Sequence, residues 1–233
     1  MVTPYKTPKH VQERKDAKKR HIINTAAKVF ASKGYNNTNM KDILAEADIS
    51  VGSFYFYFSS KDELFEKLYD DMNEIYLNVI NDALEDIFHN PVKSISKAIT
   101  LALWSFQKNS ELAKIMLVEA VGLNPHFEQR RILNNKRFSR ILEEILQQLN
   151  DKGLISTPDV KVAAVAFMGS VYTLIIDWLQ EQNAINPVEY AYPLAVYNMQ
   201  ALKLDFDPES VKEIIDGILK QDFNVVIGGM EDV

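Results

Sequence analysis

The chain has 233 residues, of which 47% are hydrophobic and 25% charged, the balance of a globular protein with a substantial core. Cysteine is absent, which excludes a disulfide scaffold, a zinc site with cysteine ligands and a thiol nucleophile. The four histidines are scattered, so neither a metal site nor a cofactor is expected. The start lacks the apolar segment of a secretory signal, and the longest apolar run, 162–176, is shorter than the roughly 20 residues of a membrane span. These features predict a cytoplasmic protein with no membrane partner.

The net charge of −6 hides an uneven distribution. Residues 1–61 contain 11 Lys and Arg against five Asp and Glu, whereas the remaining 172 residues contain 15 against 27. A basic head on an acidic body favours contact between the head and a polyanion such as nucleic acid. The alternative is a basic tail that is simply solvated.

Apolar spacing predicts a helix over 17–30 that ends before Gly34. A short helix over 40–47 follows, because Thr38 and Asn39 are both candidates for its N-cap. The chain is therefore predicted to begin with two helices, one long and one short.

A tight corner at 48–49 leads to a second short helix over 51–56, which Ser50 can cap. A long helix then begins at Ser60. Ser60 and Glu63 have the spacing of a capping box, in which each side chain bonds the other residue's backbone.

Prolines divide the rest of the chain. Five of them follow a residue whose side chain can cap a helix, and each pair predicts a helix start, because proline suits the first turn and holds the preceding residue extended. Another helix begins at Ser110, and Pro193 falls inside an expected helix, which must start late or kink there. Nine or ten helices and no strand are predicted, so the fold class is all-α. The five pairs are Asn90-Pro91, Asn124-Pro125, Thr157-Pro158, Asn186-Pro187 and Asp207-Pro208.

The two short helices and the longer helix before them form a three-helix unit of helix-turn-helix type. The second short helix begins with the small residues of 50–53, which allow it to enter a major groove. Tyr55 and Tyr57 carry hydroxyls that can reach phosphates, and Lys61 sits at a helix N-terminus, where a phosphate is favoured.

The stretch IINTAAKVFASKGYNNTNMKDILAEADISVGSFYFYFSSKDELF resembles the DNA-binding domain of TetR-type transcriptional regulators. The match needs no gap. Leu44 stands where Ala is usual and Asp48 where Gly is usual, and Asp tolerates the left-handed backbone of a corner better than most residues. The matching positions are Phe30, Gly34, Tyr35, Thr38, Ile43, Ala47, Ser50, Gly52, Tyr55, Phe58, Lys61 and Leu64.

The resemblance implies an all-helical homodimer. Residues 1–60 would form the N-terminal arm and the helix-turn-helix domain, and residues 61–233 a helical domain that binds a small ligand and dimerises. Phe54 and Phe58 are expected in the core. The DNA-binding residues that the resemblance implies are Thr38, Asn39, Lys41, Ser50, Val51, Gly52, Ser53, Tyr55, Tyr57 and Lys61.

The segment before residue 16 is expected to be a flexible basic arm. It carries Lys6, Lys9, Arg14 and Lys15. Such an arm could lie along or in the minor groove, or it could only increase solubility and attract phosphates non-specifically.

The segment 158–182 is apolar nearly all round, which predicts a helix buried on several sides. Small residues along it permit close helix packing. The resemblance implies that this helix and the next form a four-helix dimer interface with their symmetry mates, the alternative being the core of a monomer. The expected interface residues are Ala163, Ala166, Gly169, Ser170, Tyr190, Leu194 and Tyr197.

The abundance of Phe, Met and Tyr in the C-terminal domain favours a small apolar or aromatic effector, whereas a cationic drug would pair with Glu119 or Asp177. The candidate ligand-binding residues are Trp104, Phe106, Met116, Glu119, Phe127, Phe167, Met168, Tyr172 and Trp178.

The sequence therefore predicts a ligand-responsive repressor that leaves a palindromic double-stranded operator when its effector binds. One alternative keeps the helix-turn-helix domain but gives the C-terminal domain a protein partner. A helical enzyme is the more remote alternative, because the sequence contains no glycine-rich phosphate loop and no nucleophile elbow, and no catalytic residue is predicted.

Overall fold

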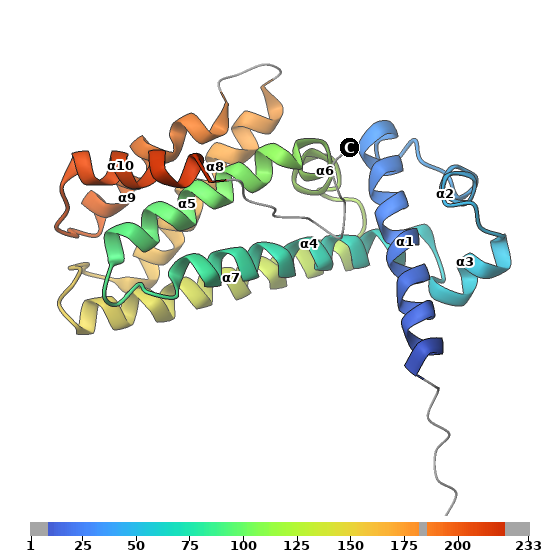
Figure 1. The fold of residues 1–233 in the computed structure, drawn as a ribbon, viewed down its shortest axis with the longest axis horizontal. Helices are drawn as coiled ribbons and strands as arrows, with labels where there is room; N and C mark the ends of the chain where they lie inside the picture. Colours follow the sequence, from blue (N-terminus) through green and yellow to red (C-terminus); the bar gives the residue numbers. More distant parts are fainter. Residues whose placement is uncertain (1–8, 182–185, 222–233) are drawn as a thin grey trace, which may run out of the picture. The chain divides into compact units, whose positions relative to one another are not determined.

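The computed structural model describes residues 9–181 and 186–221, which form ten α-helices, one π-helix and one 3-10 helix, with no strand in those ranges. The all-α prediction is confirmed. Contacts divide the chain into two compact units, one that ends at Met72 and one that starts at Asn73 (Figure 1). We call them the head and the body, and each is described by itself.

Helix α1 of the head spans Lys9–Lys33 and begins well before the predicted start at residue 17. Residues 9–16 are helical, so the expectation of a flexible arm there is wrong, while Lys6 lies outside the described residues. Polar contacts one turn apart support this stretch: Lys9 lies 3.8 Å from Glu13, and Gln12 donates to Asp16 at 2.9 Å. Residues 9–16 are mostly exposed, so they carry no apolar stripe from which the helix could be predicted.

Helices α2 (Met40–Glu46) and α3 (Val51–Tyr57) match the two predicted short helices. Asn39, rather than Thr38, caps α2. Asn39 Oδ1 accepts from the Asp42 N–H at 3.1 Å, and the Asp42 carboxylate accepts from the Asn39 N–H at 2.9 Å. These reciprocal bonds form a capping box that the sequence analysis did not identify.

Helix α4 spans Lys61–Leu84, so it begins in the head and ends in the body. As predicted, Ser60 Oγ accepts from the Glu63 N–H, at 3.0 Å. The return bond differs from the prediction, because the Glu63 carboxylate accepts from the N–H of Ser59 at 2.7 Å.

Aromatic rings form the centre of the head. Tyr35 lies 5.6 Å from Phe30 and 4.5 Å from Phe65, measured between ring centroids, and Phe30 meets Phe65 edge-on at 5.3 Å. Phe54 and Phe58 are 0% and 2% exposed, which confirms their predicted place in the core. These rings fix α3 within the head, and the opposite side of α3 is left for solvent.

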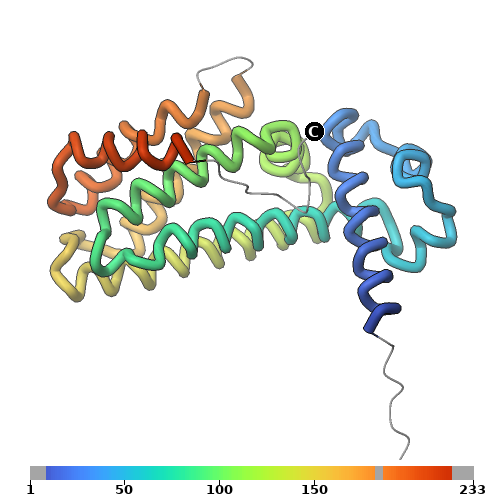
Figure 2. Tube along the Cα trace, in the orientation of Figure 1, coloured from blue at the N-terminus to red at the C-terminus, as the bar shows by residue number. Residues whose placement is uncertain are grey.

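The body contains the remaining helices. Helix α5 contacts both α9 and α10, α7 packs on α8, and α8 also contacts α9 (Figure 2). One large apolar cluster, which includes Leu103, Leu149 and Ala195, joins them. The elements are α5 (Pro91–Lys108), α6 (Ser110–Lys114), the π-helix η1 (Ile115–Glu119), α7 (Pro125–Asp151), α8 (Val160–Gln180), the 3-10 helix η2 (Pro187–Tyr190), α9 (Ala191–Ala201) and α10 (Pro208–Leu219).

Three of the five proline pairs begin α-helices as predicted. Asn124 caps α7 by accepting from the Phe127 N–H at 2.7 Å, and Asp207 caps α10. Asn90 precedes α5 but makes no side-chain cap hydrogen bond, and its side-chain amide donates to Asp86.

The other two pairs need correction. Helix α8 begins at Val160 and is capped by Asp159, whose carboxylate accepts from the Val162 N–H at 2.9 Å, so the predicted start at Thr157-Pro158 is wrong. The pair Asn186-Pro187 begins η2 rather than α9. Helix α9 starts late, at Ala191, and Pro193 lies in its first turn, where no kink is needed.

Candidate functional site

The corner between α2 and α3 is shaped by backbone geometry. Asp48 has φ of 48°, in the left-handed region that the corner was predicted to require. The Ile49 N–H then bonds the Leu44 carbonyl at 3.1 Å, and Ser50 Oγ accepts from the Ser53 N–H at 3.2 Å. The turn and the start of α3 are therefore both fixed by local hydrogen bonds.

Helix α3 presents one apolar face to solvent. Val51, Tyr55 and Phe56 are 56%, 56% and 65% exposed, although the opposite side of the same helix carries the buried Phe54. Gly52 lies on the exposed side with no atom within 4 Å of an added Cβ, so the backbone there is open to a close approach. This exposed face has the shape and small N-terminal residues that reading a major groove requires.

Phe56 was missed by the sequence analysis. Only its neighbours Phe54, Tyr55, Tyr57 and Phe58 were assigned a place, in the core or at the DNA. Helix geometry gives the signal: with about 100° per residue, Phe56 lies about 160° from Phe54 and thus nearly opposite the core.

The other implied DNA contacts lie in different surroundings. Asn39, Lys41 and Ser50 are exposed, whereas Ser53 and Tyr57 are partly buried. Thr38 is 2% exposed, and its hydroxyl donates to the Gly34 carbonyl at 2.7 Å. This side chain holds the turn between α1 and α2, so the geometry does not favour it as a phosphate ligand.

Lys61 is also engaged inside the head. Its Nζ donates to the carbonyls of Tyr35 at 2.9 Å and Thr38 at 2.8 Å, and lies 4.0 Å from the centroid of the Tyr35 ring. Partial burial lowers the pKa of Lys61, since desolvation disfavours its charged form. An ammonium group has three donors, so two of them position the start of α4 against the turn before α2. Its predicted phosphate contact stays a prediction.

Helices α8 and α9 expose an apolar surface in the body. On α8, the residues Val162, Val165, Ala166 and Gly169 recur every three to four positions and are all exposed. Tyr197 of α9 is 60% exposed. The expected burial of α8 on several sides is wrong for the single chain, where only Ala164, Ile175 and Leu179 of this helix are buried.

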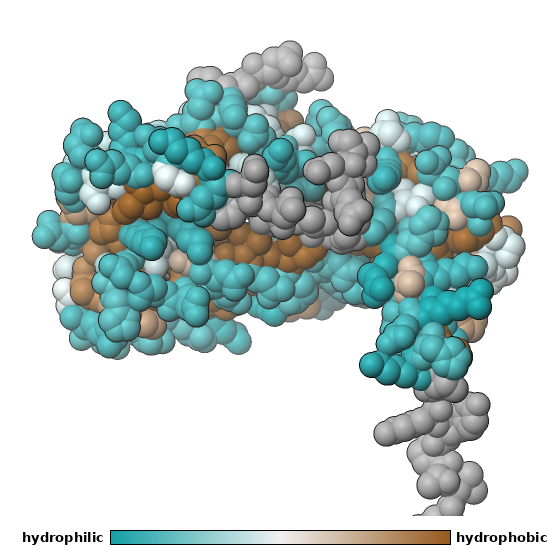
Figure 3. Space-filling model, in the orientation of Figure 1, coloured by the Kyte–Doolittle hydropathy of each residue, from teal (hydrophilic) through white to brown (hydrophobic). Residues whose placement is uncertain are grey.

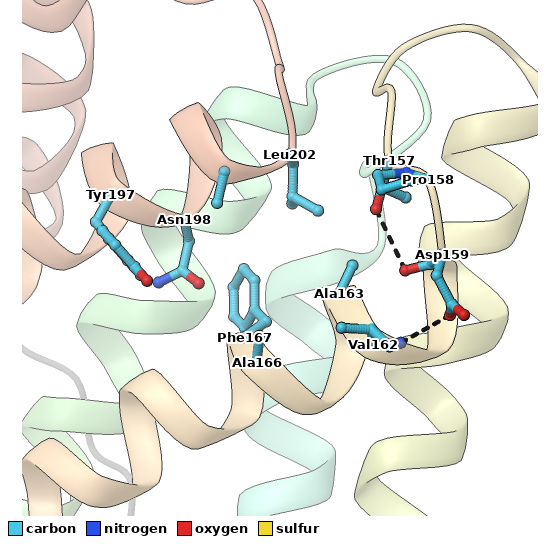
Figure 4. Close-up of a pocket in the computed structure, with 11 residues that line it drawn as sticks. Thr157, Pro158, Asp159, Val162, Ala163, Ala166, Phe167, Tyr197, Asn198 and Leu202 are labelled. Carbon is cyan, nitrogen blue, oxygen red and sulfur yellow. Dashed lines mark hydrogen bonds between the residues drawn. The ribbon is translucent and has the colours of Figure 1, made fainter.

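A cavity of about 210 Å³ lies between these two helices. Figure 4 shows Tyr197 and Asn198 extending from α9 toward Phe167 of α8, with the α8 cap at Asp159 at the other end. Asn198 Nδ2 donates to Ser170 Oγ at 3.1 Å, which ties α9 to α8 within the chain. Together the cavity and the surrounding exposed residues form what we call the α8–α9 face.

The seven expected interface residues do not all lie at the surface. Ala166, Gly169 and Tyr197 are exposed, Ala163, Ser170 and Tyr190 are partly buried, and Leu194 is buried. Leu194 therefore packs within its own chain.

Helix α8 is also long and apolar enough to cross a membrane, the only described helix that is, with 17% of its most apolar window buried. One such helix is weak evidence, because core helices of soluble proteins pass the same test. The exposure of its small residues fits packing against another helix equally well.

The nine candidate ligand residues are dispersed. Only Phe167 lines the α8–α9 cavity. Met116 and Phe127 are completely buried, and Glu119 lies at the surface. Asp177, the other acid considered for a cationic drug but not one of the nine, is also exposed, and solvent weakens any ion pair that either acid forms with a bound cation. The other five (Trp104, Phe106, Met168, Tyr172 and Trp178) are partly buried.

Two buried hydroxyls in the body have no hydrogen-bond partner within the described ranges. They are Tyr76 Oη on α4 and Ser105 Oγ on α5. The Tyr76 ring lies 4.5 Å from the Phe106 ring, and burial raises the pKa of Tyr76. A buried polar atom without a partner costs free energy, so such atoms point to a ligand or water that completes them. Sequence patterns could not identify Tyr76, because its spacing is that of a core residue.

Comparison with known proteins agrees with this arrangement. The family model described as "Bacterial regulatory proteins, tetR family" matches residues 22–68. The regulator UidR of Escherichia coli K12 is 30% identical over 146 residues, 61% of this chain and 70% of UidR. The probable acrEF/envCD operon repressor of the same organism is 22% identical over 205 residues, 84% of this chain and 90% of that protein.

A solved structure shows the same fold. AibR, in complex with isovaleryl coenzyme A and operator DNA, superposes with a TM-score of 0.62 at 22% identity, covering 81% of this chain and all of AibR.

Proposed function

Because the chain belongs to the TetR family of DNA-binding transcriptional regulators, we propose that it is a homodimeric repressor that an apolar effector releases from a palindromic operator. The exposed face of α3 carries the proposal. Three large side chains of this short helix are left in water while a fourth anchors it in the core. An interaction site is the usual reason for such a face.

A selection of bound duplexes from a random-sequence library tests operator binding. We expect a palindrome or near-palindrome whose half-site centres are about 34–36 Å apart, one helical turn, because each protomer contributes one α3. The absence of any enriched sequence would contradict the proposal.

A matched pair of variants locates the contact. Tyr55→Ala should weaken binding to the selected duplex by about 10- to 100-fold, the effect of one lost base or backbone contact. Leu133→Ala, which shortens an equally exposed side chain on α7, should have no effect. Equal effects of the two changes would place the DNA surface elsewhere.

The α8–α9 face supports the proposed dimer. Exposed Val162, Val165 and Tyr197 on adjacent helices would be covered by the same face of a second chain, since a twofold interface is self-complementary. The small residues Ala166 and Gly169 permit the close approach. This arrangement also buries α8 in a protein interface rather than in a membrane, as expected of a cytoplasmic regulator.

We propose the interior of the body as the effector site and an acyl thioester of coenzyme A as the first class to test. AibR was solved with isovaleryl coenzyme A. In this chain, the unpartnered hydroxyls of Tyr76 and Ser105 lie within an apolar interior and could bond a carbonyl group. Coenzyme A thioesters of increasing chain length should raise the melting temperature, whereas a protein-binding body would respond to none.

Tyr76→Phe separates binding from stability. Removing an unsatisfied buried hydroxyl should leave the stability unchanged or increased, because no hydrogen bond is lost. The affinity for the effector should fall about 5- to 10-fold, the value of one neutral hydrogen bond. Phe106→Leu, which changes the neighbouring ring without removing a polar atom, is the control. A Tyr76→Phe variant with unchanged affinity would exclude this hydroxyl from the site.

Release from DNA requires reciprocal coupling. If the effector lowers operator affinity by about 5- to 150-fold, the operator must lower effector affinity by the same factor. The only tryptophans, Trp104 and Trp178, both lie in the body, so fluorescence can report effector binding with and without the operator. Equal effector affinities in the two titrations would exclude allosteric release.

A further inference from the structure

In the first three turns of α1, four basic residues lie on one side of the helix. At about 100° per residue, Arg14, Lys15, Lys18 and Lys19 lie within one arc of about 140°. Glu13 and Asp16 lie on the opposite side of the helix. We call the four basic residues the α1 basic stripe. In Figure 3, the surface over these turns is hydrophilic.

Two contacts place the stripe beside the exposed face of α3. Lys15 Nζ lies 5.5 Å from the centroid of the Phe56 ring, and Lys19 Nζ lies 5.4 Å from that of Phe58. Phe56 has the most exposed of the large apolar side chains of α3, at 65%, and adjoins Tyr55. The stripe therefore continues the surface that we propose to face DNA, and its outer members, Arg14 and Lys18, are exposed beyond it.

Helical structure limits what this stretch can contact. An α-helix with its side chains is about 10–12 Å wide, and the minor groove of B-DNA is about 6 Å wide. Residues 9–20 consequently cannot enter the minor groove as an extended arm does. A helix that crosses the outside of the duplex can still reach phosphates with Arg and Lys.

We infer that the α1 basic stripe is a second DNA-binding element, which binds the phosphate backbone outside the base pairs that α3 reads. Two observations support the DNA backbone as the partner of the stripe: the charges are complementary, and the stripe continues the exposed face of α3. The inference rests on the proposed DNA binding. The stripe gives each protomer phosphate contacts that add affinity independently of sequence, whereas α3 makes the base contacts.

A random-sequence 30-bp duplex tests the inference, because phosphate contacts do not depend on sequence. The double variant Arg14→Gln/Lys18→Gln should lower the slope of log affinity against log salt by about 2 per protomer, at about 0.9 per lost contact. The ratio of the wild-type DNA affinity to that of the double variant should fall about tenfold per protomer between 50 and 200 mM salt.

The matched control lies on the same helix. Lys9→Gln/Arg20→Gln removes one Lys and one Arg that are also exposed but lie near the acidic side. This variant should change the slope by less than half as much. Circular dichroism should show unchanged helix content in both variants.

The outcomes separate the two claims. A wild type that binds no DNA at any salt concentration overturns both the proposed function and the inference. If the wild type binds, two outcomes overturn the inference alone. Equal slope changes in the two double variants would show that only the total charge of the helix matters, and no change in either would show that these residues make no phosphate contact.

Discussion

The head and the body of this chain are both helical, but different interactions define them. In the head, short polar contacts set each turn: Asn39 with Asp42, Ser50 with Ser53 and Lys61 with two carbonyls. In the body, long helices meet through a broad apolar cluster, and one apolar face remains exposed. The turns of the head are thus fixed by local contacts within one chain. Each unit leaves an apolar face exposed: the face of α3 in the head, which we propose to face DNA, and the α8–α9 face in the body, which we propose to face a second chain.

The largest effect should come from a charge placed on the α8–α9 face. Gly169 is exposed, and an added Cβ would meet no atom within 4 Å, so Gly169→Arg fits the folded chain. In a dimer, the same change buries an unpaired charge from each protomer at a cost of several kcal/mol. We expect dimer affinity to fall at least about a thousandfold, measured by sedimentation.

Circular dichroism of this variant tests whether the α8–α9 face is left for a second chain or is packed within its own. Helix content should be unchanged if the face is an interface. Loss of the fold would instead show that Gly169 is packed within the chain, and a folded dimer would exclude the face as the interface.

The second effect concerns the head. Phe54→Ala removes a completely buried ring and should cost about 3–5 kcal/mol of head stability. Phe56→Ala, two residues away, should cost under about 1 kcal/mol, because its ring is 65% exposed. Hydrogen exchange resolved along the chain can measure the head alone, while Trp104 and Trp178 report the body.

Similar costs for the two substitutions would show that the exposed side of α3 is covered. An equal loss of protection in head and body would show that the two units unfold together.

A third effect decides what Lys61 does. Lys61→Met should destabilise the head by about 1–2 kcal/mol, because two carbonyls lose a charged donor that is partly open to solvent. If the role is positioning alone, DNA affinity falls but the salt slope stays constant. A slope reduced by about 0.9 per protomer would show that Lys61 also binds a phosphate.

The smallest effect is a pH dependence of the head. The side-chain bond from Lys33, followed by that from the Asn39 N–H, lowers the pKa of Asp42. A carboxylate with a lowered folded-state pKa stabilises the protein above its unfolded pKa, and this contribution is lost as pH falls through the folded pKa. Asp42→Asn should therefore reduce the acid sensitivity of α2 in hydrogen exchange. An unchanged pH profile would show that Asp42 does not contribute to it.

The head could be predicted well because its signals are local. The Ser50 cap follows from residue type and spacing, and the left-handed corner at Asp48 from the resemblance, in which Gly is usual at that position. The same locality explains one error, at residues 9–16, and one feature that the sequence did not show, the internal partners of Lys61. Residues 9–16 form a helix through polar contacts that no apolar pattern shows, and Lys61 finds its partners 23 and 26 positions away in the sequence.

The body was less predictable for a physical reason. An apolar side chain has the same appearance in a sequence whether it packs in a core, lines a cavity or covers a partner. Val165 and Ile175 of α8 illustrate this, since one is exposed and the other buried. Tyr76 belongs to the same class, because only its three-dimensional surroundings show that its hydroxyl has no partner among residues 9–181 and 186–221.

The exposed α8–α9 face also has a genetic consequence. A chain with a defective α3 but an intact face would still pair with normal chains, and at equal expression only about a quarter of the dimers would keep two working heads. Such alleles should be dominant. A chain with a broken face would pair with nothing, so its allele should be recessive. The order of dominance among mutant alleles would then map the two surfaces without any purified protein.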